Sequence, residues 1–404
     1  MPHLSRCSEE GATRSAPLVA EIVRAHGPDF QRTHLLTPDQ GRTLRAIAAC
    51  RTAVLGGHLD VCLACGYSRP SYNSCRNRHC PTCQGKASAA WVEARMQRVL
   101  PTPYFHLVFT LPEQLRPLVH RNRRRLFALL FEAAAATLLT LATDPKHLGA
   151  TIGITAVLHT WTRDLSFHPH LHCVVTGGGL APGGDHWIAS TYSRFLFPVQ
   201  VMSALFRGKF MAGVVRLYER GELDLGGPLE SLRDPEAFGL LKDSLYRKRW
   251  VVYAKQPFGG PQQVFSYLGL YTHRVAISNR RVLAVDQNTV RFRTKGAKAV
   301  TLAHPEFLRR LVHHVLPKGF VKIRHYGLLA PRHADTKLET ARRLLGDSAP
   351  AADSLTRATS PGPDEPRDPE PVSDSPRCPL CGDSVLLRLP LPAQRPPPPA
   401  ESRP

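Results

Sequence analysis

The chain has 404 residues, 43% of them hydrophobic, which is enough for a catalytic core and at least one smaller module. Lys and Arg outnumber Asp and Glu by 53 to 32, so the formal net charge of +21 makes a polyanion, above all nucleic acid, the expected partner. An Arg-rich surface composition accounts for part of this excess without any partner.

Three further observations bear on where the chain works. Residues 126–142 form a long apolar run, but the run contains Glu132 and is shorter than the ~20 residues of a membrane span, so we expect a buried helix and no membrane role. The first residues carry several charges and no apolar core, so we expect no secretory signal. The ten cysteines are clustered with metal-ligand spacing, which favours a reducing, cytoplasmic location.

The N-terminal part is predicted to be a leader followed by a zinc module. Residues 1–30 are expected to be weakly ordered apart from a short helix near residues 18–25. A second helix should begin after Thr37, with Pro38 in its first position, and run to about Cys50. We assign residues 31–95 to a zinc-binding module for DNA recognition, because arginines and tyrosines accompany its cysteines.

Two Cys-x-x-Cys pairs dominate this module. Fourteen residues separate them, the spacing of a tetrahedral zinc site whose four thiolates leave no open position, so the metal would be structural. The predicted ligands are Cys62, Cys65, Cys80 and Cys83. Four other cysteines and histidines alternate with these pairs, and they either form a second zinc site or only support the first. They are Cys50, His58, Cys75 and His79.

The middle of the chain predicts a small sheet with helices on its faces. Residues 104–111 form a clear strand, 113–142 are helical, and 152–161 form a second strand that leads directly to a third at 167–179. Later, 185–197 suggest an edge strand, 198–222 a helix and 248–255 another strand, whereas 223–248 are expected to be loop-rich.

Alternating histidines mark the third strand. Because successive side chains of a strand point to opposite faces, His168, His170 and His172 share one face, while Leu171 and Cys173 enter the apolar layer. Imidazoles gathered in this way can hold a metal. Satisfied polar-face histidines give the same pattern, so the strand alone decides nothing.

Two tyrosines follow about a hundred residues later. Gly260 and Pro261 suit the start of a helix, whose spacing places Tyr267 and Tyr271 on one face. Tyrosines at this spacing are also common in a protein core, so this stretch is not decisive alone either.

The last ordered part is predicted to contain a basic hairpin. Residues 281–285 and 289–295 form its arms, and in the second arm Val290 and Phe292 face inward while the cations share the other face. Such a stripe suits a phosphate track, although a solvated sheet face gives the same pattern. The candidate DNA-binding residues are Arg274, Arg280, Arg281, Arg291, Arg293 and Lys295.

A helix at 304–316 and a strand at 320–326 follow, and the composition then changes. Residues 346–404 are rich in Pro and poor in apolar residues, so we expect a disordered tail. Inside it, Cys378 and Cys381 form a lone Cys-x-x-Cys pair that either shares a zinc with a partner or is the remnant of a zinc ribbon.

Several separated blocks together resemble one family. They are Leu-His-Thr-Trp at 158–161, His-Pro-His-Leu-His at 168–172, Tyr-Leu-Gly-Leu-Tyr-Thr-His-Arg-Val-Ala-Ile-Ser-Asn at 267–279 and Leu-Pro-Lys-Gly-Phe at 316–320. With the cysteine cluster before them, they resemble the HUH nucleases, and more closely the two-tyrosine, rolling-circle transposases of bacterial insertion sequences. The resemblance covers about residues 30–330.

The resemblance implies an α+β fold, with an HUH-type antiparallel sheet flanked by helices as a catalytic domain over residues 101–330. It implies that His170 and His172 hold a catalytic Mg²⁺ or Mn²⁺. The third ligand should come from a neighbouring element, and we choose His159 on the preceding strand, with His168 and Gln263 as alternatives.

The implied activity is nicking and rejoining of single-stranded DNA at the ends of a mobile element. Tyr267 or Tyr271 would attack a phosphate and form a 5′-phosphotyrosine, without ATP. A plasmid replication initiator or relaxase would use the same chemistry, and a catalytically silent zinc-dependent DNA-binding protein would bind DNA without forming an adduct. The oligomeric state, the recognised end sequence and the tyrosine that attacks first stay open.

Overall fold

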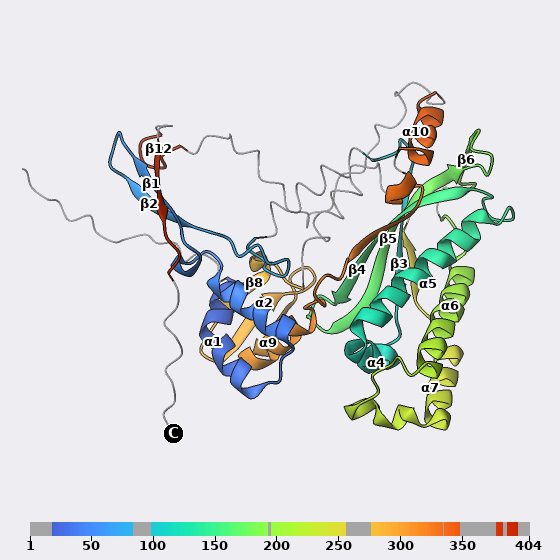
Figure 1. Cartoon of the computed structure of the whole chain (residues 1–404), viewed down its shortest axis with the longest axis horizontal. Helices are drawn as coiled ribbons and strands as arrows, with labels where there is room; N and C mark the ends of the chain where they lie inside the picture. The colour runs from blue at the N-terminus through green and yellow to red at the C-terminus, as the bar shows by residue number, and fades with distance from the viewer. Residues whose placement is uncertain are drawn as a thin grey trace, which may run out of the picture. The chain divides into compact units, whose positions relative to one another are not determined.

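The computed structural model describes residues 18–83, 98–192, 195–255, 276–333, 335–347, 377–382 and 386–394 (Figure 1). The chain divides into two compact units. Unit 1 contains Met1–Cys83, Ile277–Val312 and Glu370–Pro404, and unit 2 contains Gln84–Ala276 and His313–Pro369. Residues 277–312 thus cluster with the N-terminal module, whereas the sequence-based division placed them with the catalytic domain.

A six-stranded antiparallel sheet forms the centre of unit 2. Its order is β11-β4-β5-β3-β7, and β6 pairs with β5. The strands are β3 (Tyr104–Thr110), β4 (Thr151–Trp161), β5 (Phe167–Leu180), β6 (Trp187–Ala189), β7 (Val252–Lys255) and β11 (Ile323–Gly327). The strands predicted around the histidines and the predicted α+β class are therefore confirmed.

Helices cover one face of this sheet (Figure 1). Those packed there are α4 (Arg116–Arg121), α5 (Arg123–Thr143), α6 (Val199–Glu219) and α7 (Pro235–Arg247). They share a core with alternate strand residues such as Leu107, Leu171 and Cys173, as the period of two predicts. By length and composition α5 could cross a membrane, but 67% of its most apolar window is buried inside the protein, as in a core helix.

Helix α7 corrects the prediction of a loop-rich stretch at 223–248. The side chain of Asp234 accepts hydrogen bonds from the backbone N–H groups of Glu236 and Ala237, and Pro235 occupies the first helical position. Asp-Pro-Glu was thus a start signal in the sequence. Short connecting helices complete unit 2: η2 (Glu113–Leu115), η3 (Gly227–Arg233), η5 (Pro331–His333) and α10 (Lys337–Asp347).

Unit 1 joins helices with two three-stranded antiparallel sheets, β12-β1-β2 and β10-β9-β8. Thr37 caps α2 with Gln40 in a capping box, as predicted. The elements are α1 (Val19–Thr33), α2 (Pro38–Ala49), η1 (Ala53–Leu55), β1 (Gly57–Cys62), β2 (Ser68–Tyr72), η4 (Asn279–Arg281), β8 (Val282–Val285), β9 (Thr289–Arg293), β10 (Ala299–Ala303), α9 (His304–His313) and β12 (Leu386–Leu391).

Contacts distant in sequence hold unit 1 together. The backbone N–H of Val19 donates to Asn279 Oδ1, and Gln40 Nε2 donates to the carbonyl of Val312, at 3.1 and 3.0 Å. Strand β12 corrects the predicted disordered tail over residues 386–391, which pair with β1 along its whole length. The tail as a whole is poor in apolar residues, but this segment reads Leu-Leu-Arg-Leu-Pro-Leu, and its main chain has partners in β1.

Candidate active site

Histidines from neighbouring strands meet on the sheet face opposite the one that α5 and α6 cover. His159 on β4 and His170 on β5 are register partners, and His172 lies one alternation further along β5. One ring nitrogen from each lies within 4.8 Å of the other two, and we call this set the three-histidine cluster. Alternation explains the geometry, because Leu158, Leu171 and Cys173 enter the core beneath it.

Hydrogen bonding sets the tautomer of His170. Its Nδ1 lies 2.7 Å from the carbonyl oxygen of His168, which can only accept, so Nδ1 carries the hydrogen and Nε2 keeps its lone pair. Burial lowers the pKa of His170 to about 4, although that hydrogen bond opposes the shift. The imidazole is therefore neutral at physiological pH, the form that binds a metal.

The sequence analysis missed His106 on β3. Its Nε2 lies 2.8 Å from Nδ1 of His172, and the two rings are stacked with centroids 5.0 Å apart. The bond occupies Nδ1 of His172 and leaves Nε2 for another partner. The available signal was a histidine at an alternate position of a strongly apolar strand. A buried partner of this kind orients a metal-ligating ring.

His168, one of the two alternatives for the third ligand, lies outside the three-histidine cluster. A guanidinium nitrogen of Arg116 donates to its Nδ1 at 3.3 Å. Burial, and then the charge of Arg116, lower the pKa of His168. His159, in contrast, is 3% exposed and stacks on Trp161 with ring centroids 4.6 Å apart. Arg116 thus places a cation beside the histidines.

The donor set fits a divalent transition metal. Three imidazole nitrogens held by adjacent strands offer borderline ligands, which suit such ions better than they suit Mg²⁺, whose preferred ligands are oxygens. Of the two predicted ions, Mn²⁺ therefore fits these residues better.

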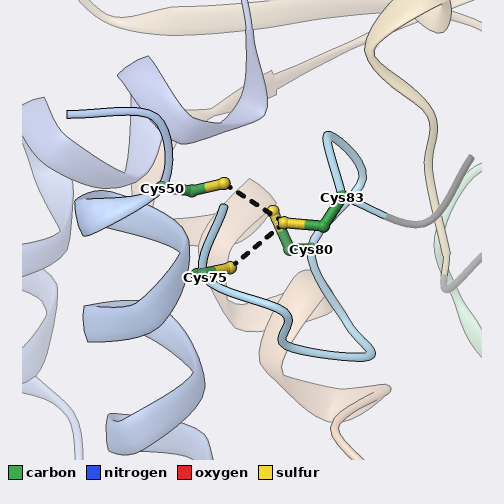
Figure 2. A group of neighbouring side chains, drawn as sticks. All are labelled: Cys50, Cys75, Cys80 and Cys83. Atoms are coloured by element: carbon green, nitrogen blue, oxygen red, sulfur yellow. Dashed lines mark hydrogen bonds between the residues drawn. The ribbon is translucent and has the colours of Figure 1, made fainter. Parts of the chain in front are cut away.

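The cysteines of unit 1 form two separate clusters. The first cysteine cluster contains Cys50, Cys75, Cys80 and Cys83 (Figure 2). Its Cys83 sulfur lies 3.2 Å from that of Cys50 and 3.4 Å from that of Cys75. A hydrogen bond from the Cys75 thiol lowers the pKa of Cys80 to about 5, although burial opposes the shift, and favours the thiolate that binds zinc.

The second cysteine cluster contains Cys62, Cys65, Cys378 and Cys381. The predicted single site therefore needs correction, because its two Cys-x-x-Cys pairs belong to different clusters. Knuckle spacing could not reveal this, since each pair can complete a tetrahedron with any other pair that the fold brings close.

The predicted second site with two histidines is also wrong in its ligand set. His58 Nε2 lies 3.4 Å from an oxygen of Asp60, and His79 Nδ1 lies 3.2 Å from Oδ1 of Asn77. Neither histidine belongs to a cysteine cluster, whereas Cys50 and Cys75 complete the first one.

The basic hairpin has the predicted alternation. Val290 and Phe292 on β9 are buried, whereas the cations beside them are exposed. The exposed cations are Arg280, Arg291, Arg293 and Lys295. Arg281 is partly buried, and its guanidinium lies 5.6 Å from the centroid of the Phe292 ring.

Comparison with known proteins places the chain in a family. A family model described as "Putative transposase" matches residues 153–337, and one described as "Transposase zinc-binding domain" matches residues 22–111. "Putative transposase y4qJ" of Sinorhizobium fredii is 46% identical over 386 residues, covering 93% of this chain and 96% of that protein. The chain belongs to the two-tyrosine, rolling-circle family of insertion-sequence transposases.

A second relative of this transposase is the "Transposase for insertion sequence element IS801" of Pseudomonas savastanoi pv. phaseolicola. It is 31% identical over 367 residues, covering 85% of this chain and 82% of that protein. No solved structure matches the chain. A transposase is a DNA-cleaving enzyme that acts on the DNA of its mobile element, so the predicted enzyme class and the coarse partner are confirmed.

The family match also bears on the cofactors of the transposase. The zinc-binding domain model spans the whole first cysteine cluster and the Cys62-Cys65 pair of the second. Together the domain and the clusters support zinc. Four further predicted site residues lie outside the described residues: Gln263, Tyr267, Tyr271 and Arg274.

Proposed function

We propose that this transposase nicks and rejoins single-stranded DNA at the ends of its element through 5′-phosphotyrosine intermediates, with a divalent metal on His159, His170 and His172. The observation that carries the proposal is the convergence of one nitrogen from each of these histidines within 4.8 Å. We further propose that the first cysteine cluster holds a structural zinc in the DNA-recognition module.

Each residue of the site has a separable task. His159, His170 and His172 hold the metal, which when bound polarises the scissile phosphate and stabilises its developing charge. His106 keeps the His172 ring in position by their 2.8 Å hydrogen bond. Arg116, beside His168, supplies a cation for a non-bridging phosphate oxygen.

A tyrosine is the nucleophile. A free phenol ionises near pH 10, so at neutral pH it must lose its proton as it attacks. The bond from Tyr267 Oη or Tyr271 Oη to phosphorus forms, the bond from phosphorus to the 3′ oxygen breaks, and that oxygen gains a proton and leaves as a 3′-hydroxyl. Attack by another 3′-hydroxyl reverses these changes, so rejoining needs no nucleotide cofactor.

Two tyrosines allow two strands to be held at once. Tyr267 and Tyr271 are four residues apart, and the second can attack a new strand before the first is released. The alternating exposed cations of β9, Arg291 and Arg293, would hold the backbone of the bound strand.

The test is covalent capture. Purified full-length protein is incubated with end-labelled single strands from its element and Mn²⁺, and denaturing gels reveal protein-linked DNA. We expect an adduct that disappears in the Tyr267→Phe/Tyr271→Phe double variant and in His170→Ala. Tyr246→Phe is the matched control, because Tyr246 is a 41% exposed tyrosine of α7, which packs on the sheet face opposite the three-histidine cluster. This variant should retain the adduct.

The single tyrosine variants show whether the two phenols are interchangeable. DNA binding without any adduct on authentic ends would contradict the proposal and favour a silent zinc-dependent DNA-binding protein. An adduct only on plasmid origins would favour a replication initiator or relaxase.

A further inference from the structure

The second cysteine cluster joins residues from the two ends of the chain. We propose that Cys62, Cys65, Cys378 and Cys381 hold a second structural Zn²⁺, which closes a zinc ribbon built from residues 57–72, 377–382 and 386–394. The inference is independent of the tyrosine chemistry. Residues 377–394 also lie outside both stretches matched by the family models, 22–111 and 153–337.

The sulfur positions carry the first step. The sulfurs of Cys62 and Cys381 are 3.5 Å apart, and those of Cys65 and Cys378 are 3.6 Å apart. All four lie within 4.8 Å of one another. A tetrahedron with Zn–S bonds of about 2.3 Å separates its sulfurs by about 3.8 Å, so a small outward shift would accommodate the ion.

The two Cys-x-x-Cys segments also have the same local geometry. Each is followed by a glycine with positive φ, Gly66 at 73° and Gly382 at 78°. In both, the glycine N–H donates to the carbonyl of the first cysteine at 2.9 Å. Zinc knuckles are expected to have this arrangement, in which two matching turns direct their paired sulfurs toward one point. A C-terminal segment that lay nearby by chance would not need to have the same turn geometry.

Strand pairing makes the C-terminal segment part of the same module. Register pairs run from Gly57 with Leu391 to Cys62 with Leu386, so the knuckle cysteine Cys62 is itself part of the pairing with β12. Arg388 Nε donates to Asp60 Oδ1 at 2.8 Å across this pair of strands.

Gly56, the residue that follows η1, leaves room for the C-terminal segment. Gly56 has φ 63° and ψ −166°, a conformation nearly restricted to glycine. A Cβ there would come within 2.8 Å of the carbonyl oxygen of Leu391. Beyond it the N–H of Gln394 donates to the carbonyl of Ala53 at 3.0 Å. Ala53 and Gly56 therefore contact the C-terminal segment, in addition to the contacts made by the sulfurs of Cys62 and Cys65.

The test is metal stoichiometry in the full-length protein, purified with zinc under reducing conditions and measured by mass spectrometry of the metal. We expect the Cys378→Ser/Cys381→Ser double variant to hold one zinc ion per chain fewer than the wild type, whatever the three-histidine cluster binds. The matched control is Leu380→Ala, which changes a 70% exposed side chain inside the same knuckle and should keep the zinc content of the wild type. Equal zinc contents in the wild type and the double variant would overturn the proposal.

A second measurement guards against misfolding and against disulfides. In protein loaded with Co²⁺, the thiolate-to-metal absorption should fall by about half in the double variant, and the remaining half shows that the first cysteine cluster is intact. Thiols are then counted after denaturation without reductant, with the metal removed by chelator. Four fewer reactive thiols than cysteines in the wild type would mean two disulfides and would overturn the zinc assignment.

Discussion

The three-histidine cluster and the second cysteine cluster gather ligands in opposite ways. The histidines lie between residues 159 and 172 on adjacent strands of a six-stranded sheet with a large apolar core beneath it. The cysteines come from two turns more than three hundred residues apart in sequence, both joined to the three-stranded sheet β12-β1-β2. The six-stranded sheet should hold the histidines in place with or without a metal, whereas the second cysteine cluster should depend on its metal for its fold.

The largest expected effect concerns the first cysteine cluster, which lies in the same unit and should depend on its metal in the same way. Cys80→Ser in the first cysteine cluster should destabilise unit 1 by several kcal/mol, because binding of a structural zinc contributes on the order of 10 kcal/mol to folding. His170→Ala should leave the thermal unfolding of both units close to that of the wild type. Calorimetry with and without chelator measures both, and a Cys80→Ser protein as stable as the wild type would break the comparison.

A smaller effect is expected at His106. His106→Ala should raise the Mn²⁺ concentration needed for half-maximal adduct formation by about 10–100-fold, because the His172 ring loses the partner that orients it. The rate at saturating Mn²⁺ should change much less. His325→Ala is the control, because it removes an imidazole that is hydrogen-bonded to Thr155 in the same sheet. An unchanged Mn²⁺ requirement would remove His106 from the site.

A substitution at Gly56 tests whether β12 packs closely beside this residue. Gly56→Ala should lower the free energy of unfolding of unit 1 by about 1–3 kcal/mol, because alanine is strained at this φ and ψ and its Cβ would meet Leu391. Gly296→Ala is the matched control in the same unit: its φ is also positive, at 57°, but its surroundings are open. Urea unfolding compares them, and equal losses would argue against the close approach of β12.

The smallest effect concerns DNA affinity. The Arg291→Ala/Arg293→Ala variant should bind single strands of any sequence more weakly, with the slope of log affinity against log salt reduced by about 1.4, or ~0.7 for each lost phosphate contact. Arg32→Ala, which removes an exposed cation paired with Asp29, serves as the control. An unchanged salt slope would indicate that the exposed face of β9 is solvated and does not contact DNA phosphates.

The convergence of the three histidines could be predicted from the sequence because strand periodicity is a local rule. Alternation placed His170 and His172 on one face, and the choice of His159 needed only that the preceding strand be the neighbour of β5. His106 escaped notice because nothing in the sequence shows that β3 is the other neighbour of β5.

The cysteine partners could not be predicted in the same way. The spacing of Cys62 and Cys65 identifies a metal knuckle, but its partner is chosen by a fold that brings residue 378 beside residue 65. The Pro-rich composition around β12 hid the strand, although four of its six residues are leucines, because a short edge strand also needs the backbone partners that only the fold provides.

The most direct test of the central claim compares His159→Ala with His168→Ala in the Mn²⁺-dependent adduct assay on single-stranded element ends. Both residues lie next to His170, but only His159 belongs to the three-histidine cluster. We predict that His159→Ala lowers adduct formation by at least about 100-fold at limiting Mn²⁺ and that His168→Ala lowers it by less than about 10-fold. Full activity of His159→Ala together with loss of activity in His168→Ala would contradict the assigned metal site.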